Sequence, residues 1–129
     1  MDNFIDLFRH ETNLRSVGAG QPVFLAGDEG QVMFVLVEGQ ADVLVGDEPV
    51  ECAGPGAILG EMALIDSAPR SATVIARTAC RLLPIDVEKF NALIQKKPDF
   101  ARLVMKAMAG RIRSMNNRNR VLIQHFLTF

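Results

Sequence analysis

The chain has 129 residues, with 14 Lys and Arg against 15 Asp and Glu, and 49% of its side chains are hydrophobic. This balance is typical of one compact domain and leaves no room for a second, so residues 1–129 are expected to fold as a single unit. No apolar stretch reaches the roughly 20 residues that a membrane span needs. Cys52 and Cys80 lack metal-ligand spacing, and the start of the chain resembles no signal peptide, so we expect a reducing, cytoplasmic location.

Charge is divided unevenly along the chain. Residues 1–85 carry 12 acidic and 5 basic side chains, whereas residues 86–129 carry 3 acidic and 9 basic ones. One interpretation is that the basic part folds back on the acidic part of its own chain. The alternative is that the basic segment contacts nucleic acid, an anionic membrane surface or an acidic protein.

Turn residues crowd the first half of the chain, where nine of the ten glycines lie between Gly18 and Gly60. The runs between these turns are short and rich in β-branched and apolar residues. This pattern predicts a small all-β sandwich or roll. The expected strands cover residues 22–25, 32–37, 41–45, 50–52, 57–59, 72–76 and 80–85.

After Ile85 the apolar period changes from 2 to 3.6, which predicts helices. Asp86 is expected to cap a first helix that ends near Lys97, and Pro98 to begin a longer one. The asparagine-rich stretch 116–120 has poor helix propensity, so this helix either continues or bends near Asn116. The predicted organisation is an N-terminal helical segment (1–17), a β-roll (18–85) and C-terminal helices (86–129).

The segment from Gly60 to Val74 carries the residues with the most specific chemistry. Gly60 lacks a Cβ and lets a ligand approach the backbone, and Glu61 to Ile65 can form one helical turn whose free N–H groups attract an anion. Arg70 offers a planar fork of donors to two phosphate oxygens. Beside such a cation Glu61 is expected to stay ionised and to accept hydrogen bonds from sugar hydroxyls.

This segment resembles the phosphate-binding cassette (60–74) of cyclic nucleotide-binding domains, which occur in bacterial catabolite activator proteins, regulatory subunits of cyclic-AMP-dependent kinase and cyclic nucleotide-gated channels. The pattern is Gly-Glu-(Leu or Met)-Ala-Leu, a short spacer, and Pro-Arg-(Ser, Thr or Ala)-Ala-(Thr or Ser)-Val. It is met at nearly every position, with one departure at Leu59, where Phe is frequent. The resemblance implies an eight-stranded antiparallel β-roll (jelly roll) with a short N-terminal helix, a hinge helix and a long C-terminal helix.

The resemblance also implies the ligand and its contacts. The expected ligand is cAMP, with cGMP as the alternative, because the Ser71 hydroxyl can serve either base. Glu61 would accept the ribose 2′-hydroxyl and Arg70 would pair with the cyclic phosphate. The alternative is that these two side chains form only a buried ion pair that closes a loop. Further binding groups would come from Gly60, Met62, Ala63, Ser71 and Ala72.

Two arginines of the long helix, Arg111 and Arg118, fall near the middle of its apolar arc. Each either reaches solvent or pairs with a carboxylate of the roll, such as Glu38 or Asp42. Alternatively, one of them stacks on the purine while a neighbouring asparagine bonds the edge of the base. The candidate lid residues are Arg111, Asn116, Arg118 and Asn119.

Catalysis and metal binding are not expected, since His10 and His125 are the only histidines and no serine lies in a nucleophile pattern. We expect no DNA-binding, catalytic or pore domain beside the predicted roll. The leading hypothesis is therefore a stand-alone receptor for a cyclic nucleotide that acts through a protein partner or a homodimer formed by its C-terminal helix. The alternative is a structural or interaction domain that works through this basic helix, with nucleotide binding lost or secondary.

Overall fold

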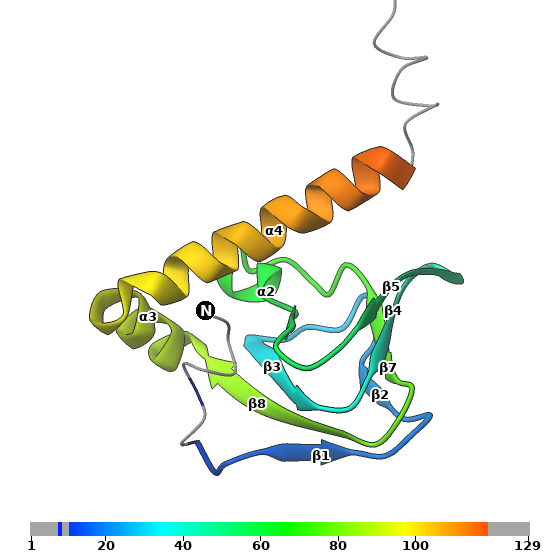
Figure 1. Cartoon of the computed structure of the whole chain (residues 1–129), viewed down its shortest axis with the longest axis horizontal. Coiled ribbons are helices and arrows are strands. Elements are labelled where there is room, and N and C mark those ends of the chain that lie inside the picture. The colour runs from blue at the N-terminus through cyan, green and yellow to red at the C-terminus, as the bar shows by residue number, and fades with distance from the viewer. Residues whose placement is uncertain (1–7, 9–10, 119–129) are drawn as a thin grey trace, which may run out of the picture.

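The computed structural model describes residue 8 and residues 11–118, with side chains as far as residue 114. Eight antiparallel strands form two four-stranded sheets, and the two long helices follow them (Figure 1). The sheet orders are β1-β8-β3-β6 and β2-β7-β4-β5, so the predicted eight-stranded β-roll is confirmed. The strands are β1 (Arg15–Val17), β2 (Pro22–Phe24), β3 (Val32–Glu38), β4 (Ala41–Val45), β5 (Glu48–Ala53), β6 (Ile58–Leu59), β7 (Thr73–Ala76) and β8 (Cys80–Asp86).

Strand β1 is the one that the sequence pattern did not predict. It lies at the end of segment 1–17, which was expected to be helical, and it pairs with β8 so that Val17 lies opposite Cys80. Only Val17 of its three residues is buried. Three residues are too few to show the alternation of apolar and polar side chains that indicates a strand. The helical prediction is therefore wrong for residues 15–17.

Strand β3 separates two apolar clusters because it is covered on both faces. Phe34 and Leu36 join the cluster between the two sheets, whereas Met33 and Val35 join the cluster that faces the helices. Burial on both faces explains why this strand reads as a continuous apolar run rather than as an alternating one. The helix-facing cluster also contains Phe100, which anchors the C-terminal helices to the roll.

The two long helices begin where the sequence predicts. Helix α3 (Val87–Lys96) is capped by Asp86, whose carboxylate accepts a hydrogen bond of 2.8 Å from the Lys89 backbone N–H. Helix α4 (Pro98–Arg118) has Pro98 in its first turn, where the missing N–H costs nothing. No helix in the described ranges is both long and apolar enough to cross a membrane.

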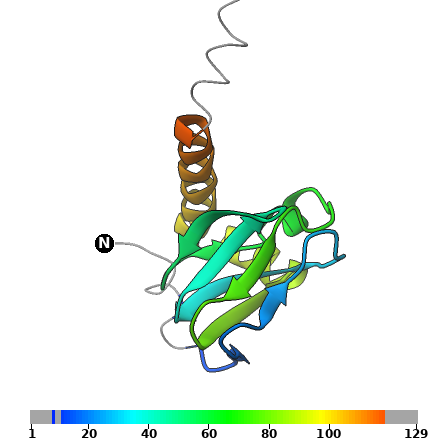
Figure 2. The ribbon, with the colours of Figure 1, turned by 90° about the vertical axis from the view of Figure 1, so that its right-hand side faces the viewer.

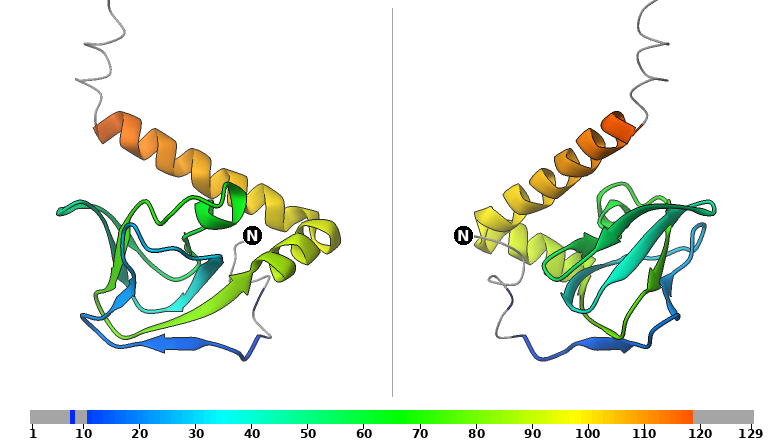
Figure 3. Two further views of the ribbon diagram at one scale, coloured as in Figure 1. Left: turned by 180° about the vertical axis from the view of Figure 1, so that it is seen from behind. Right: turned by 45° about the vertical axis from the view of Figure 1, so that its right-hand side comes forward.

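Helix α4 lies over one end of the roll. It passes above the short helix α2 (Met62–Ile65), and its last turns rise above strands β4 and β5 (Figures 1 and 2). The view from behind gives the same arrangement, with α3 at the corner where α4 begins (Figure 3). Helix α4 continues without interruption as far as Arg118, and the rest of the asparagine-rich stretch 116–120 lies outside the described residues.

Candidate functional site

Arg70 is a buried cation held by backbone carbonyl groups. Its residue is only 8% exposed, its Nη1 donates to the Gly60 carbonyl at 3.1 Å, and its Nη2 donates to the Val32 carbonyl at 2.6 Å. The guanidinium also lies over the Phe24 ring, 4.3 Å from its centre. Burial lowers the pKa of Arg70, and the charge of Asp28 offsets part of this effect. Among the described residues no carboxylate forms an ion pair with it, so its charge is available to an anion.

Two glycines leave room for this guanidinium. A Cβ added at Gly30 would lie 2.6 Å from Nη2 of Arg70, and one added at Gly60 would collide with Nη1. Gly60 also has a φ of 77°, in the left-handed region that side chains disfavour. The sequence predicts Gly60 as a point of close approach. Gly30 was missed as a site residue, since its only signal in the sequence is its place among the turn glycines between Gly18 and Gly60.

The segment after Gly60 forms the single helical turn that the sequence predicts. Ala63 N–H donates to the Gly60 carbonyl at 3.3 Å, and Leu64 N–H donates to the Glu61 carbonyl at 3.1 Å. In the described part of the chain no acceptor is found for the N–H groups of Glu61 and Met62, as is usual at a helix start.

The loop after α2 returns to the turn between β2 and β3, which contains Gly27 and Asp28. The Arg70 backbone N–H donates to the Asp28 carbonyl at 2.8 Å, and the Gly27 N–H donates to the Arg70 carbonyl at the same distance. Ser71 is exposed beside this loop, and Ala72 is partly buried just before β7. The loop therefore brings Arg70 next to the start of α2, as the cassette prediction requires.

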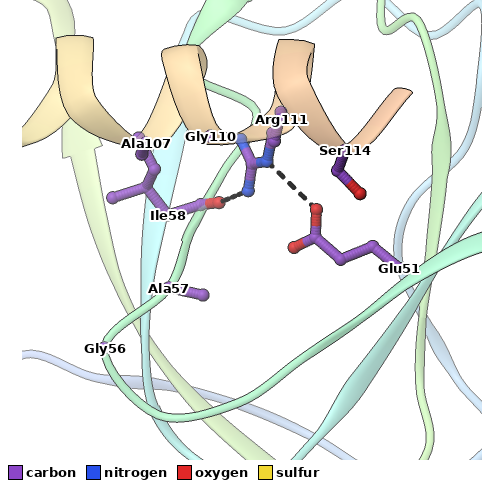
Figure 4. Close-up of a pocket in the computed structure, with 8 residues that line it drawn as sticks. All are labelled: Glu51, Gly56, Ala57, Ile58, Ala107, Gly110, Arg111 and Ser114. Atoms are coloured by element: carbon purple, nitrogen blue, oxygen red, sulfur yellow. Dashed lines mark hydrogen bonds and ion pairs between the residues drawn. The ribbon is translucent and has the colours of Figure 1, made fainter. Parts of the chain in front are cut away.

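Glu61 is buried, and its partner is Arg111 of helix α4. Nη1 of Arg111 lies 2.5 Å from Oε1 of Glu61, and the Glu61 side chain is 5% exposed. Arg111 also pairs with Glu51 of β5, with 3.3 Å between Nε and Oε1, and donates to the Ile58 carbonyl (Figure 4). Burial by itself would lower the pKa of Arg111, but the two carboxylates outweigh this and raise it.

These contacts correct two sequence predictions. The cation beside Glu61 is Arg111 and not Arg70, whose donors are directed to backbone carbonyls. Arg111 does pair with carboxylates of the roll, which is one of the two predicted alternatives, but these carboxylates are Glu51 and Glu61 rather than Glu38 or Asp42. Glu38 and Asp42 pair instead with arginines on neighbouring β-strand segments, at 3.6 Å to Arg81 and 3.0 Å to Arg77.

A cavity of about 300 Å³ lies between α4 and the β5–β6 segment, beside Arg111. Small residues form much of its wall, and its three polar side chains, Glu51, Arg111 and Ser114, lie together at one end (Figure 4). The lining residues are Glu51, Gly56, Ala57, Ile58, Ala107, Gly110, Arg111 and Ser114.

Arg111 faces the roll, as the helical wheel predicts. The side chains of Asn116 and Arg118, and the whole of Asn119, lie outside the described residues, so the base lid stays a prediction.

A second cavity, of about 340 Å³, is lined by Arg70 and Phe24 together with Asp28 and Glu29, which lie between β2 and β3. The site therefore combines a buried cation without a carboxylate ion-pair partner among the described residues, the start of a helix, and the buried carboxylate of Glu61, which directly follows Gly60. Such a set of groups suits a ligand that carries both an anion and hydroxyl groups. In the described part of the chain no cluster of His, Cys, Asp and Glu is arranged to hold a metal ion.

A β-roll whose buried arginine and glutamate flank one helical turn defines a class of ligand-binding domain. The family model of the Cyclic nucleotide-binding domain matches residues 14–97. The chain therefore belongs to the cyclic nucleotide-binding domain family.

Relatives of this chain include larger proteins. A cyclic nucleotide-gated potassium channel of Mesorhizobium japonicum is 42% identical over 97 residues, which are 75% of this chain and 27% of the channel. The cyclic AMP receptor protein of Thermus thermophilus is 32% identical over 114 residues, which cover 84% of this chain and 53% of the receptor. The chain thus spans from about a quarter to about half of these proteins.

Solved structures share the fold. The crystal structure of the Thermus thermophilus catabolite activator protein matches with a TM-score of 0.77 at 29% identity, covering 92% of this chain and 58% of that one. A structure from work on a cyclic-GMP-dependent signalling pathway in bacterial phytopathogenesis matches with a TM-score of 0.74 at 27% identity. This match covers 88% of this chain and 95% of the chain in that structure.

Proposed function

We propose that this domain binds a 3′,5′-cyclic nucleotide reversibly, without chemical change, and that its role is regulatory. The observation that carries the proposal is Arg70, a buried guanidinium next to the start of α2 with no carboxylate partner among the described residues. A cyclic phosphate has one negative charge and two exocyclic oxygens, which match the fork of an arginine. Glu61 would then accept the ribose 2′-hydroxyl, and the cassette backbone from Gly60 to Ala63 and at Ser71 and Ala72 would complete the site.

The proposed ligand is cAMP, with cGMP as the alternative. The similarity to a receptor named for cyclic AMP supports the first choice. The similarity to a structure from a cyclic-GMP-dependent pathway supports the second, and the exposed Ser71 hydroxyl can serve either base.

Isothermal titration calorimetry with cAMP and with cGMP tests the proposal. We expect saturable one-site binding of at least one of them, and binding of 5′-AMP that is at least about tenfold weaker, because the open phosphate carries a second charge and no longer fits a single guanidinium. If neither cyclic nucleotide binds at millimolar concentration, the proposal is wrong, and the interaction-domain alternative takes its place.

Gly30→Ala tests whether Arg70 is the phosphate contact. The added methyl would meet Nη2 of Arg70 and push the guanidinium away from its two carbonyl acceptors. We expect at least about a tenfold loss of cAMP affinity by calorimetry, since one charge-assisted contact contributes about 1.5 to 3 kcal/mol. Gly54→Ala is the matched control, because nothing lies within 4 Å of a Cβ there. Equal affinity of the two variants would contradict the assignment of Arg70.

The outer face of helix α4 supports the second part of the regulatory role. Met105 and Ile112 are 63% and 58% exposed, and their spacing of seven residues places them on one face, two turns apart. Lys106 and Arg113 follow each of them directly. We propose that this face contacts a protein partner or a second copy of the chain. Nucleotide binding would then act by changing this contact.

A further inference from the structure

The cavity between α4 and the β5–β6 segment adjoins the carboxylate that would bind the sugar. Under the proposed function, on which this inference rests, Glu61 accepts the ribose 2′-hydroxyl. Arg111 contacts Glu61 and also lines this cavity of about 300 Å³. In a nucleoside the base is attached to the carbon next to the one that carries the 2′-hydroxyl. Because the phosphate would lie at Arg70, which lines the other cavity, the cavity beside Arg111 is left for the base.

The α4 side of this cavity has little side-chain bulk. Ala107 and Gly110 line it, and a Cβ added at Gly110 would meet nothing within 4 Å. A glycine inside a helix is unfavourable compared with alanine, and at Gly110 neither a positive φ nor a close neighbour requires one. The open space beside Gly110 therefore suits a flat ring that lies against the backbone of α4.

Glu51 offers this cavity a charged hydrogen-bond acceptor. Its Oε1 lies 3.3 Å from Nε of Arg111, whereas its Oε2 has no partner among the described residues. Figure 4 shows this second oxygen turned away from the arginine and into the cavity. Of the other two polar side chains in the lining, Arg111 has only donors and the Ser114 hydroxyl is uncharged. Glu51 is therefore the strongest side-chain acceptor there, because hydrogen bonds to an ionised group are stronger than those to a neutral one.

We propose that Glu51 is a specificity-determining residue that accepts a hydrogen bond from the exocyclic amino group of the purine. Adenine and guanine both carry such a group, so the contact serves either candidate ligand. The bond uses the free Oε2, so Arg111 keeps both of its carboxylate partners. A carboxylate has only acceptors, and a site with a buried or half-buried acceptor discriminates against an analogue that lacks the donor.

The experiment compares two ligands in two proteins. Wild type and Glu51→Ala are titrated by calorimetry with cAMP and with purine riboside 3′,5′-cyclic monophosphate, which is cAMP without its amino group. We expect wild type to bind cAMP about tenfold more tightly than the analogue, and Glu51→Ala to bind the two within about twofold of each other. Loss of the ion pair to Arg111 weakens both ligands alike and cancels in this ratio. If cGMP is the tighter ligand, the same comparison uses cGMP and cIMP, which is cGMP without its amino group.

Asp47→Ala is the matched control, because it removes one carboxylate from the exposed turn between β4 and β5 and should keep the tenfold preference. A preference of equal size in wild type and in Glu51→Ala would place the amino contact elsewhere and overturn the inference. Equal binding of the two ligands by wild type overturns it as well, since the amino group then has no partner. In both cases a cyclic nucleotide still binds and the proposed function stands. The proposed function fails only if wild type binds neither cAMP nor cGMP.

Discussion

Replacing Arg70 with alanine is expected to lower the affinity for cAMP about a hundredfold, on the order of 3 kcal/mol. The bound cyclic phosphate would be desolvated without its cationic partner, and uncompensated buried charge is among the costliest defects in a binding site. Glu61→Ala should cost less, because it removes hydrogen bonds to a neutral hydroxyl rather than the counter-charge of the ligand. Calorimetric titration of the two variants measures both losses.

Arg77→Ala is the control for this result. Arg77 is another arginine of the roll, but it is exposed and pairs with Asp42, so its loss should leave cAMP affinity within about twofold. Arg70→Ala also leaves the carbonyl groups of Gly60 and Val32 without their donor, so the variant is first checked by thermal denaturation for a folded ligand-free state. A folded Arg70→Ala variant that binds cAMP as tightly as wild type would rule out the cassette as the phosphate site.

Replacing Phe100 with alanine is expected to lower the free energy of unfolding by about 3 to 5 kcal/mol. Phe100 has no exposed surface, and its ring meets Phe8 at 6.0 Å and Phe90 at 5.5 Å, both edge to face. Its loss opens a cavity between α4, α3 and the roll, and the site depends on α4 through Arg111. Unfolding in urea, followed by circular dichroism, measures the change.

Met105→Ala gives the comparison for Phe100. Met105 lies on the same helix but is 63% exposed, so its truncation should change the stability by less than about 0.5 kcal/mol. If the two variants were equally stable, Phe100 would not be the anchor of α4.

Sequence reasoning succeeds here where the signal is local. The cap at Asp86 and the helix start at Pro98 depend on residues within four positions, and the structure has both. The cassette is similarly local, because Gly60, the turn of α2 and Arg70 fall within eleven residues of the chain.

What the sequence did not predict depends on distant pairs of residues. The periodicity of α4 shows that Arg111 faces the roll, but its partners lie 50 and 60 residues earlier, directly before α2 and on β5. Periodicity gives the face of a helix and not the residue opposite it. Gly30 was missed for the same reason, since only the folded structure brings it against the Arg70 guanidinium 40 positions later.

Helix α4 has two faces that differ in what they touch. Its inner face contacts the glutamates through Arg111, while its outer face leaves Met105 and Ile112 uncovered among the described residues. Binding free energies that share one element are reciprocal. A molecule that binds the outer face and shifts this helix therefore changes the affinity of the inner site for its ligand. By the same factor, a ligand bound at the inner site changes the affinity of the outer face. Under the proposed function, which of the two molecules responds to the other therefore depends on which one varies in concentration, and not on the fold.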